Sequence, residues 1–269
     1  MSDRPPRPRA LTIAGSDSGG GAGIQADLKT FSALGVFGMT AITAVTVQNT
    51  RGVSGYEPLS PKTVGDQIRS VAGDIGVDAA KTGMLATAPI VAAVADAVTD
   101  SGIANLVVDP VFFSKHGNEL LDVDAIGSLR TRILPLATLA TPNLAEAAGL
   151  TGTEVLTRDD MRRAADAILA LGARAVLVKG GHLQGPTASD LFADGTREEW
   201  LETERIDTPN THGTGCTLSA AITAHLARGD ELIAAVRAGK GFVTEAIRHS
   251  LAIGGGVGPV DQLWSIPRG

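Results

Sequence analysis

The sequence predicts a single α/β domain built on a mostly parallel central sheet, with helices on both faces and a small antiparallel edge. Short apolar runs alternate with helical patterns along the chain, and the loops between them are short. No repeat or low-complexity segment interrupts this alternation. With 269 residues, of which 43% are hydrophobic, the chain is long enough to bury one large core.

The composition argues against several classes of protein. The 23 basic and 29 acidic residues give a formal charge of −6, and only 3% of residues are aromatic, so nucleic acid is not an expected partner. No run of about 18 apolar residues occurs, so no membrane span is expected. A single cysteine and the absence of a signal-peptide pattern favour a reducing compartment, and we expect a cytoplasmic protein.

The first half of the chain shows the alternation clearly. Residues 1–9 are polar and rich in proline and are expected to form a flexible tail, ahead of one domain at residues 10–269. Residues 10–15 form a short apolar run that ends at a glycine, which is typical of a buried strand. By the same criteria we expect helices at 23–34, 61–74 and 89–98, and strands at 38–47, 53–58, 79–83 and 103–110.

The second half continues this pattern and ends in two helices. We expect a helix at 124–133, a strand at 137–141, a short helix opening at 142–146, a helix at 158–171, a strand at 175–178, a hairpin of 189–193 with 198–206, and helices at 218–226 and 231–250.

Glycines gather at the ends of apolar runs, as expected where loops approach a ligand through their backbone. The first such cluster, at 19–23, lies between a strand and a helix. Its spacing is not the G-x-G-x-x-G of a dinucleotide-binding fold, and it lacks the G-K-[ST] ending of a P-loop. It is therefore interpreted as a general ligand loop.

A second glycine loop points to phosphoryl transfer. Gly213, Thr214, Gly215 and Cys216 precede an apolar helix, and such a loop offers backbone N–H groups and a helix dipole to an anion. The same dipole favours a thiolate, so Cys216 could accept a proton from a substrate hydroxyl beside a bound phosphate. The alternative is that the glycines only permit a tight turn and that Cys216 packs in the core.

Polar residues follow successive predicted strands. Because parallel strands end at one edge of a sheet, these residues should gather there with the Cys216 loop. They are Gln48, Asp109, Asn143 with Glu146, and Lys179. Asp109 is suited to hold Mg²⁺. His182 and His212 are too few for a zinc site and are interpreted as hydrogen-bonding loop residues.

Four motifs make the chain recognisable: residues 11–27, 141–147, 178–182 and 211–217. Over about residues 10–262 the chain resembles the bacterial hydroxymethylpyrimidine/phosphomethylpyrimidine kinases of thiamine biosynthesis, within the ribokinase-like superfamily. The resemblance implies that fold and phosphorylation of 4-amino-5-hydroxymethyl-2-methylpyrimidine (HMP) by ATP and Mg²⁺, first to the monophosphate and then to the diphosphate. It also implies a homodimer.

The resemblance assigns roles to the site residues. Around the pyrimidine it places the Gly15 backbone, Asp27 and Gln48, with Met84 on the ring. Near Mg²⁺ and the ATP phosphates it places Asp109, Glu146, Asn143 and Lys179, and it makes the N–H groups of Gly213, Thr214, Gly215 and Cys216 an anion hole. The structural alternatives are a helix-capping carboxylate for Asp27, a core side chain for Met84, a helix-start acid for Glu146 and a solvated lysine for Lys179.

One position departs from the family pattern. Relatives carry a lysine where this chain has Gly255, so a cationic contact to the phosphates is expected to be missing. Two other functions stay open: pyridoxal kinase activity, because pyridoxal is also an aromatic ring with a hydroxymethyl group, and a non-catalytic pyrimidine sensor. Retention of Asp109, Lys179 and Cys216 argues against the sensor, because binding a neutral ring requires none of them.

Overall fold

The computed structural model describes residues 7–112, 120–181, 183 and 185–267. Across these residues nine strands form one sheet in the order β3-β2-β1-β4-β5-β6-β7-β8-β9. The strands are β1 (Arg9–Ser16), β2 (Phe37–Asn49), β3 (Gly52–Pro58), β4 (Ala79–Thr82), β5 (Leu106–Val108), β6 (Leu139–Ala140), β7 (Val176–Val178), β8 (Thr187–Ala193) and β9 (Glu198–Glu204).

The sheet is parallel from β2 to β7, which confirms the predicted fold class. Antiparallel strands lie at both ends: β3 pairs with β2, and the hairpin of β8 and β9 extends β7. The sequence predicted one small antiparallel edge. The parallel part brings the carboxyl ends of β2, β1, β4, β5, β6 and β7 to the same edge of the sheet.

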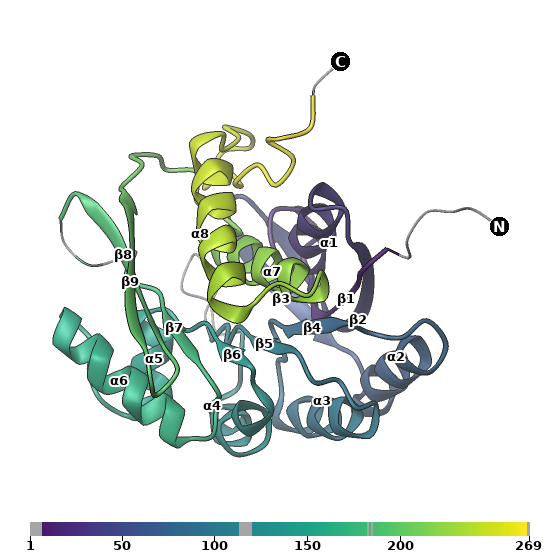
Figure 1. Cartoon of the computed structure of the whole chain (residues 1–269). Helices are drawn as coiled ribbons and strands as arrows, with labels where there is room; N and C mark the ends of the chain where they lie inside the picture. Colours follow the sequence, from purple (N-terminus) through teal and green to yellow (C-terminus); the bar gives the residue numbers. More distant parts are fainter. Residues whose placement is uncertain (1–6, 113–119, 182, 184, 268–269) are drawn as a thin grey trace.

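Helices cover both faces of the sheet (Figure 1). The helices α1 (Gly23–Ala33), α7 (Thr214–Ala227) and α8 (Leu232–Arg248) lie on one face, and α2 (Pro61–Asp74), α3 (Ala88–Asp100), α4 (Val123–Ser128), α5 (Leu144–Thr151) and α6 (Arg158–Ala170) lie on the other. Each face has its own apolar core. In β1, Leu11 and Ile13 face one core and Ala10 faces the other, which explains why this strand is apolar on both sides.

Most predicted elements are confirmed to within a few residues, with three differences. Strand β5 is shorter than predicted, and Arg9, assigned to the tail, already belongs to β1. The helix predicted at 124–133 divides into α4, a π-helical turn at Leu129–Ile133 and a 3₁₀ turn at Leu134–Leu136. Pro135 lies in that last turn, and its missing N–H prevents the α-helical hydrogen bonds from continuing. No helix among the described residues is long and apolar enough to cross a membrane.

Candidate active site

Charged residues from three strand ends converge at the carboxyl edge of the sheet. Lys179, which follows β7, donates from Nζ to Asp109 Oδ1 at 2.9 Å and lies 3.7 Å from Glu146 Oε2. Asp109 follows β5 and is buried, and Thr141 and Ser219 donate to its two oxygens, each at 3.3 Å. The structure therefore brings together three of the residues that the sequence placed at this edge: Asp109, Glu146 and Lys179.

Asn143 and Glu146 form a capping box at the start of α5. The Glu146 N–H donates to Asn143 Oδ1 at 2.9 Å, and the Asn143 N–H donates to Glu146 Oε2 at 2.7 Å. The helix-start alternative for Glu146 is thus correct, and Lys179 is partly buried and ion-paired rather than fully solvated. Capping and ion pairing leave each carboxylate with lone pairs for a further ligand.

The charges in this cluster depend on one another. Burial alone would raise the pKa of Asp109, but Lys179 and Lys81 outweigh it and hold the pKa below its ordinary value. Burial raises the pKa of Glu146, Asp109 adds to the rise, and Lys179 opposes it. Burial opposes the charge of Lys179, yet the two carboxylates raise its pKa above the ordinary value. Lys179 is therefore a partly buried cation beside one ionised carboxylate.

The N-terminus of α7 lies directly against this cluster. A Cβ added to Gly215 would lie 3.4 Å from Lys179 Nζ and 3.6 Å from Asp109 Oδ2. Gly213, the N-cap, has φ +82°, and a Cβ there would lie 1.9 Å from the carbonyl oxygen of Gly21. Glycine is required at Gly213 both for its backbone conformation and for this approach. The N–H groups of the first turn of α7, which begins at Thr214, thus lie beside an ammonium group.

Cys216 lies in the first turn of α7 and is partly buried. Burial raises the pKa of its thiol from 9.0 to about 12; Asp27 and Asp109 add to the rise, and Lys81 and the Gly23 N–H oppose it. A helix dipole contributes about 0.3–1 kcal/mol, less than the roughly 1.4 kcal/mol that one pKa unit represents. Burial therefore outweighs the dipole, and the pKa of the Cys216 thiol lies above its ordinary value.

Asp27 lies beneath the edge of the sheet and not at its surface. Lys81 Nζ donates to both Asp27 oxygens, at 3.0 and 2.9 Å, and Thr12 Oγ1 donates to Oδ2 at 2.6 Å. Neither charged side chain has any exposed area. Burial alone would lower the pKa of Lys81, but the carboxylates of Asp27 and Asp109 raise it. Burial raises the pKa of Asp27, and Lys81 and Thr12 oppose that rise. Asp27 is thus fully buried, and its oxygens are engaged by Lys81 and Thr12.

Lys81 was missed by the sequence analysis. It lies in the middle of β4, between apolar neighbours, and is one of the largest fully buried side chains. A lysine inside an apolar strand is the signal that could have revealed it, because a buried ammonium needs a carboxylate partner.

The residues assigned to the pyrimidine lie near the ends of β1, β2 and β4. A Cβ on Gly15 would lie 3.0 Å from Met84 Sδ, so the Gly15 backbone and the Met84 side chain are in contact. Met84 is 7% exposed and belongs to a core cluster, so its side chain packs in the apolar core. Gln48 is the partly exposed member of this group.

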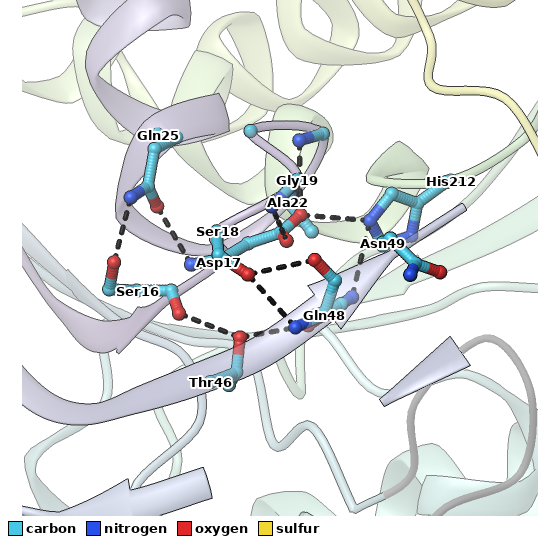
Figure 2. Close-up of polar contacts among 12 residues, drawn as sticks. Ser16, Asp17, Ser18, Gly19, Ala22, Gln25, Thr46, Gln48, Asn49 and His212 are labelled. Carbon is cyan, nitrogen blue, oxygen red and sulfur yellow. Dashed lines mark hydrogen bonds and ion pairs between the residues drawn. The ribbon is translucent and has the colours of Figure 1, made fainter. Parts of the chain in front are cut away.

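Asp17 and His212 join the two glycine loops (Figure 2). Asp17 accepts hydrogen bonds from the N–H groups of Gly19, Gly21 and Ala22 at 2.8 to 3.0 Å, and His212 Nε2 lies 2.9 Å from its Oδ2. Burial alone would raise the pKa of Asp17, but these partners hold it below its ordinary value. The interpretation of His212 as a hydrogen-bonding loop residue is confirmed, whereas His182 lies outside the described residues.

Gly255 is close to a cation that the sequence did not predict there. A Cβ on Gly255 would lie 2.7 Å from Arg51 Nη2, because the turn between β2 and β3 packs against the glycine-rich segment near the C-terminus. The Val257 N–H donates to Thr50 O at 2.8 Å in the same contact. Because Gly255 has no side chain, the guanidinium group of Arg51 occupies the space next to it.

Carboxylates near Lys179 have the chemistry of a magnesium site but do not form a complete one. Within the described residues no group of three or more His, Cys, Asp or Glu side chains is arranged to hold a metal ion. Mg²⁺ usually takes one or two carboxylates and completes its shell with water and substrate phosphates. Asp109 and Glu146, joined through Lys179, fit that requirement.

Comparison with known proteins decides the family. Residues 17–261 match the family described as Phosphomethylpyrimidine kinase. The chain belongs to this family. A hydroxymethylpyrimidine/phosphomethylpyrimidine kinase of Streptomyces coelicolor is 55% identical over 259 residues, which cover 96% of this chain and 96% of the relative.

Solved structures extend the similarity of this phosphomethylpyrimidine kinase family member. An ADP complex of Bacillus subtilis pyridoxal kinase has a TM-score of 0.90 and 46% identity, covering 96% of this chain and 98% of that one. A phosphomethylpyrimidine kinase from Clostridium difficile has a TM-score of 0.79 and 45% identity, covering 89% and 99%. Both similarities agree with the ribokinase-like fold implied by the motifs.

The raised pKa of Cys216 is testable by alkylation. The rate at which iodoacetamide modifies Cys216 in the folded protein should rise about tenfold for each pH unit up to about pH 10. Only the thiolate reacts, and the pKa of the thiol lies near 12. Cys216 is the single cysteine, so intact mass reports on it alone. The control is the urea-unfolded chain, whose rate should level off above its ordinary pKa of 9.0. A plateau near pH 8 for the folded protein would contradict the prediction.

Proposed function

We propose that this protein phosphorylates the hydroxymethyl group of HMP with ATP and then adds a second phosphate to the monophosphate, as a step of thiamine biosynthesis. The observation that carries the proposal is the ion pair of Lys179 and Asp109 against Gly215 at the start of α7. An ammonium group and the N–H groups at a helix N-terminus suit the equatorial oxygens of a phosphoryl group in transfer.

Roles for the chain's own residues follow from this placement. The N–H groups of Gly213, Thr214, Gly215 and Cys216 would hold the phosphoryl oxygens, and Lys179 with Asn143 would lie along the ATP phosphates. The substrate oxygen forms a bond to the γ-phosphorus as the bond to ADP breaks. The hydroxyl proton passes to a base, for which Cys216 is the candidate.

Asp109 and Glu146 would hold Mg²⁺, which supplies positive charge to the phosphates when bound. Before ATP arrives, Lys179 balances these carboxylates. On the substrate side, Gln48 and the Gly15 backbone would contact the polar edge of the ring, and Met84 would pack on its face. Asp27 would act from below, through Lys81 and Thr12.

Pyridoxal kinase activity is a second candidate function, favoured by the similarity to Bacillus subtilis pyridoxal kinase at 46% identity. A non-catalytic pyrimidine sensor has less support, because the Lys179–Asp109 pair costs desolvation that ring binding alone does not require.

We further propose a cytoplasmic homodimer. Its apolar surface would include Val45 and Val47 of β2, which are 47% and 64% exposed, and light scattering would measure its mass.

A coupled assay that detects ADP tests the proposed function. With ATP and Mg²⁺, HMP and HMP monophosphate should each release ADP, and phosphorus NMR should show the diphosphate. Turnover of pyridoxal alone would favour the second candidate. No ADP from any of the three compounds would overturn the assignment as a kinase.

The magnesium role of Asp109 is tested by substitution. Asp109→Asn should shift the Mg²⁺ dependence of turnover at least about tenfold upward, because it removes a charged oxygen ligand. Asp78→Asn is the matched control: Asp78 pairs with Arg9 at the opposite edge of the sheet. Overlapping Mg²⁺ titrations of Asp109→Asn and the wild type would show that Asp109 does not act through the metal.

The base role of Cys216 has a kinetic signature. Cys216→Ala should bind both substrates nearly normally but turn over at least about a hundredfold more slowly, and Cys216→Asp should recover part of the loss. If the thiolate is the base, wild-type kcat should rise with pH from 7 to 9, because a pKa near 12 leaves the thiolate scarce. Near wild-type kcat for Cys216→Ala would make Cys216 a packing residue of the anion hole.

A further inference from the structure

His212 is held rigidly where three loops meet. Its N–H donates to Gly258 O at 3.1 Å, and its carbonyl oxygen accepts from the Val260 N–H at 3.0 Å. Its ring packs against Gly21, where a Cβ would lie 2.5 Å from His212 Cδ2. The side chain is 8% exposed. The direction of its Nε2 is therefore fixed by the backbone and not by solvent.

Nε2 of His212 must carry a hydrogen. It lies 2.9 Å from Asp17 Oδ2, and an ionised carboxylate can only accept. Three backbone N–H groups hold Asp17 in place, so its carboxylate cannot turn away. His212 Nε2 is consequently a donor, whatever the protonation of its other ring nitrogen.

This donor decides which way the amide of Gln48 points. In the orientation shown in Figure 2, Gln48 Nε2 lies 3.3 Å from His212 Nε2, so two donors face each other. Gln48 Oε1 lies 3.3 Å from Thr46 Oγ1, whose single hydrogen is already engaged with Ser16 O at 2.8 Å. Neither contact can then be a good hydrogen bond.

A half-turn of the amide removes both conflicts. The single hydrogen of His212 Nε2 is then shared between Asp17 Oδ2 and the Gln48 carbonyl oxygen in a three-centre hydrogen bond, and the amide nitrogen donates to Thr46 Oγ1. We infer that His212, held by Asp17, is a positioning residue that fixes the amide of Gln48 with its oxygen toward His212 and its nitrogen toward Thr46.

A fixed amide determines the order of donor and acceptor that the substrate meets. One N–H and one oxygen lone pair of Gln48 remain free, and Gln48 is partly exposed. A ring that carries an acceptor nitrogen beside an amino group needs the Gln48 N–H opposite its nitrogen and the Gln48 oxygen opposite its amino group. Only one orientation of the amide provides this arrangement. The inference rests on the proposed function, in which Gln48 contacts the pyrimidine.

A double-mutant cycle tests this role with HMP as the substrate. His212→Leu should raise the KM for HMP about tenfold, the typical effect of one orienting hydrogen bond, and leave the KM for ATP within about threefold. In a Gln48→Leu background the same change should have less than about a threefold effect, because no amide is left to orient. Equal effects in both backgrounds, or no effect in the wild-type background, would overturn the inference.

Further variants separate orientation from stability. His212→Gln keeps an N–H donor near the same place and should restore the KM to within about threefold. Thr46→Val removes the other partner and should also raise the KM for HMP. His249→Leu, on an exposed histidine at the end of α8, is the matched control and should change neither KM. If Gln48→Leu alone leaves the KM unchanged, the proposed substrate site is wrong, and the amide orientation is then tested without substrate.

A readout without substrate is independent of the proposed function. The Gln48 side-chain NH₂ signals of ¹⁵N-labelled protein, assigned by their loss in Gln48→Leu, should move in His212→Leu and stay nearly unchanged in His249→Leu. Unmoved signals in a folded His212→Leu protein would overturn the inference, even if HMP proves to be the substrate.

Discussion

The site depends on the close approach of two glycine loops from opposite ends of the chain. A Cβ at Gly213 would lie 1.9 Å from Gly21 O, so any other residue would push the loop after β1 away from the start of α7. The same approach brings His212 to Asp17 and Cys216 to the Gly23 N–H. Substrate-side and phosphate-side loops are therefore joined through their backbones, which leaves little freedom for either to move alone.

Charges of opposite sign alternate beneath these loops. In this series Asp27 pairs with Lys81, Asp109 pairs with Lys179, and Glu146 lies on the far side of Lys179. A buried charge is tolerated when it has a partner, and removing one partner is costly. A phosphate entering here would meet an ammonium group and N–H donors. The partly buried Cys216 thiol, whose pKa burial raises to about 12, is protonated at neutral pH.

In the proposed function, catalysis and recognition use different parts of the same edge. The charged residues that would handle phosphate follow β5, β6 and β7, whereas the residues that would contact the ring lie near the ends of β1, β2 and β4. Similarity to both a pyridoxal kinase and phosphomethylpyrimidine kinases is consistent with this division. One scaffold can serve different hydroxymethyl rings if only the recognition side chains change.

The sequence alone determined the parallel sheet, the order of its elements and the edge at which Asp109, Lys179 and the Cys216 loop meet. Apolar periodicity and glycine positions are local signals, and parallel strands share one carboxyl edge. Only the tertiary structure decided that Asp27 lies beneath the site, that Cys216 stays protonated and that His212 faces Gln48. Burial depth and charge partners come from distant residues: Lys81 is 54 positions from Asp27, and His212 is 164 from Gln48. No local pattern records such pairings.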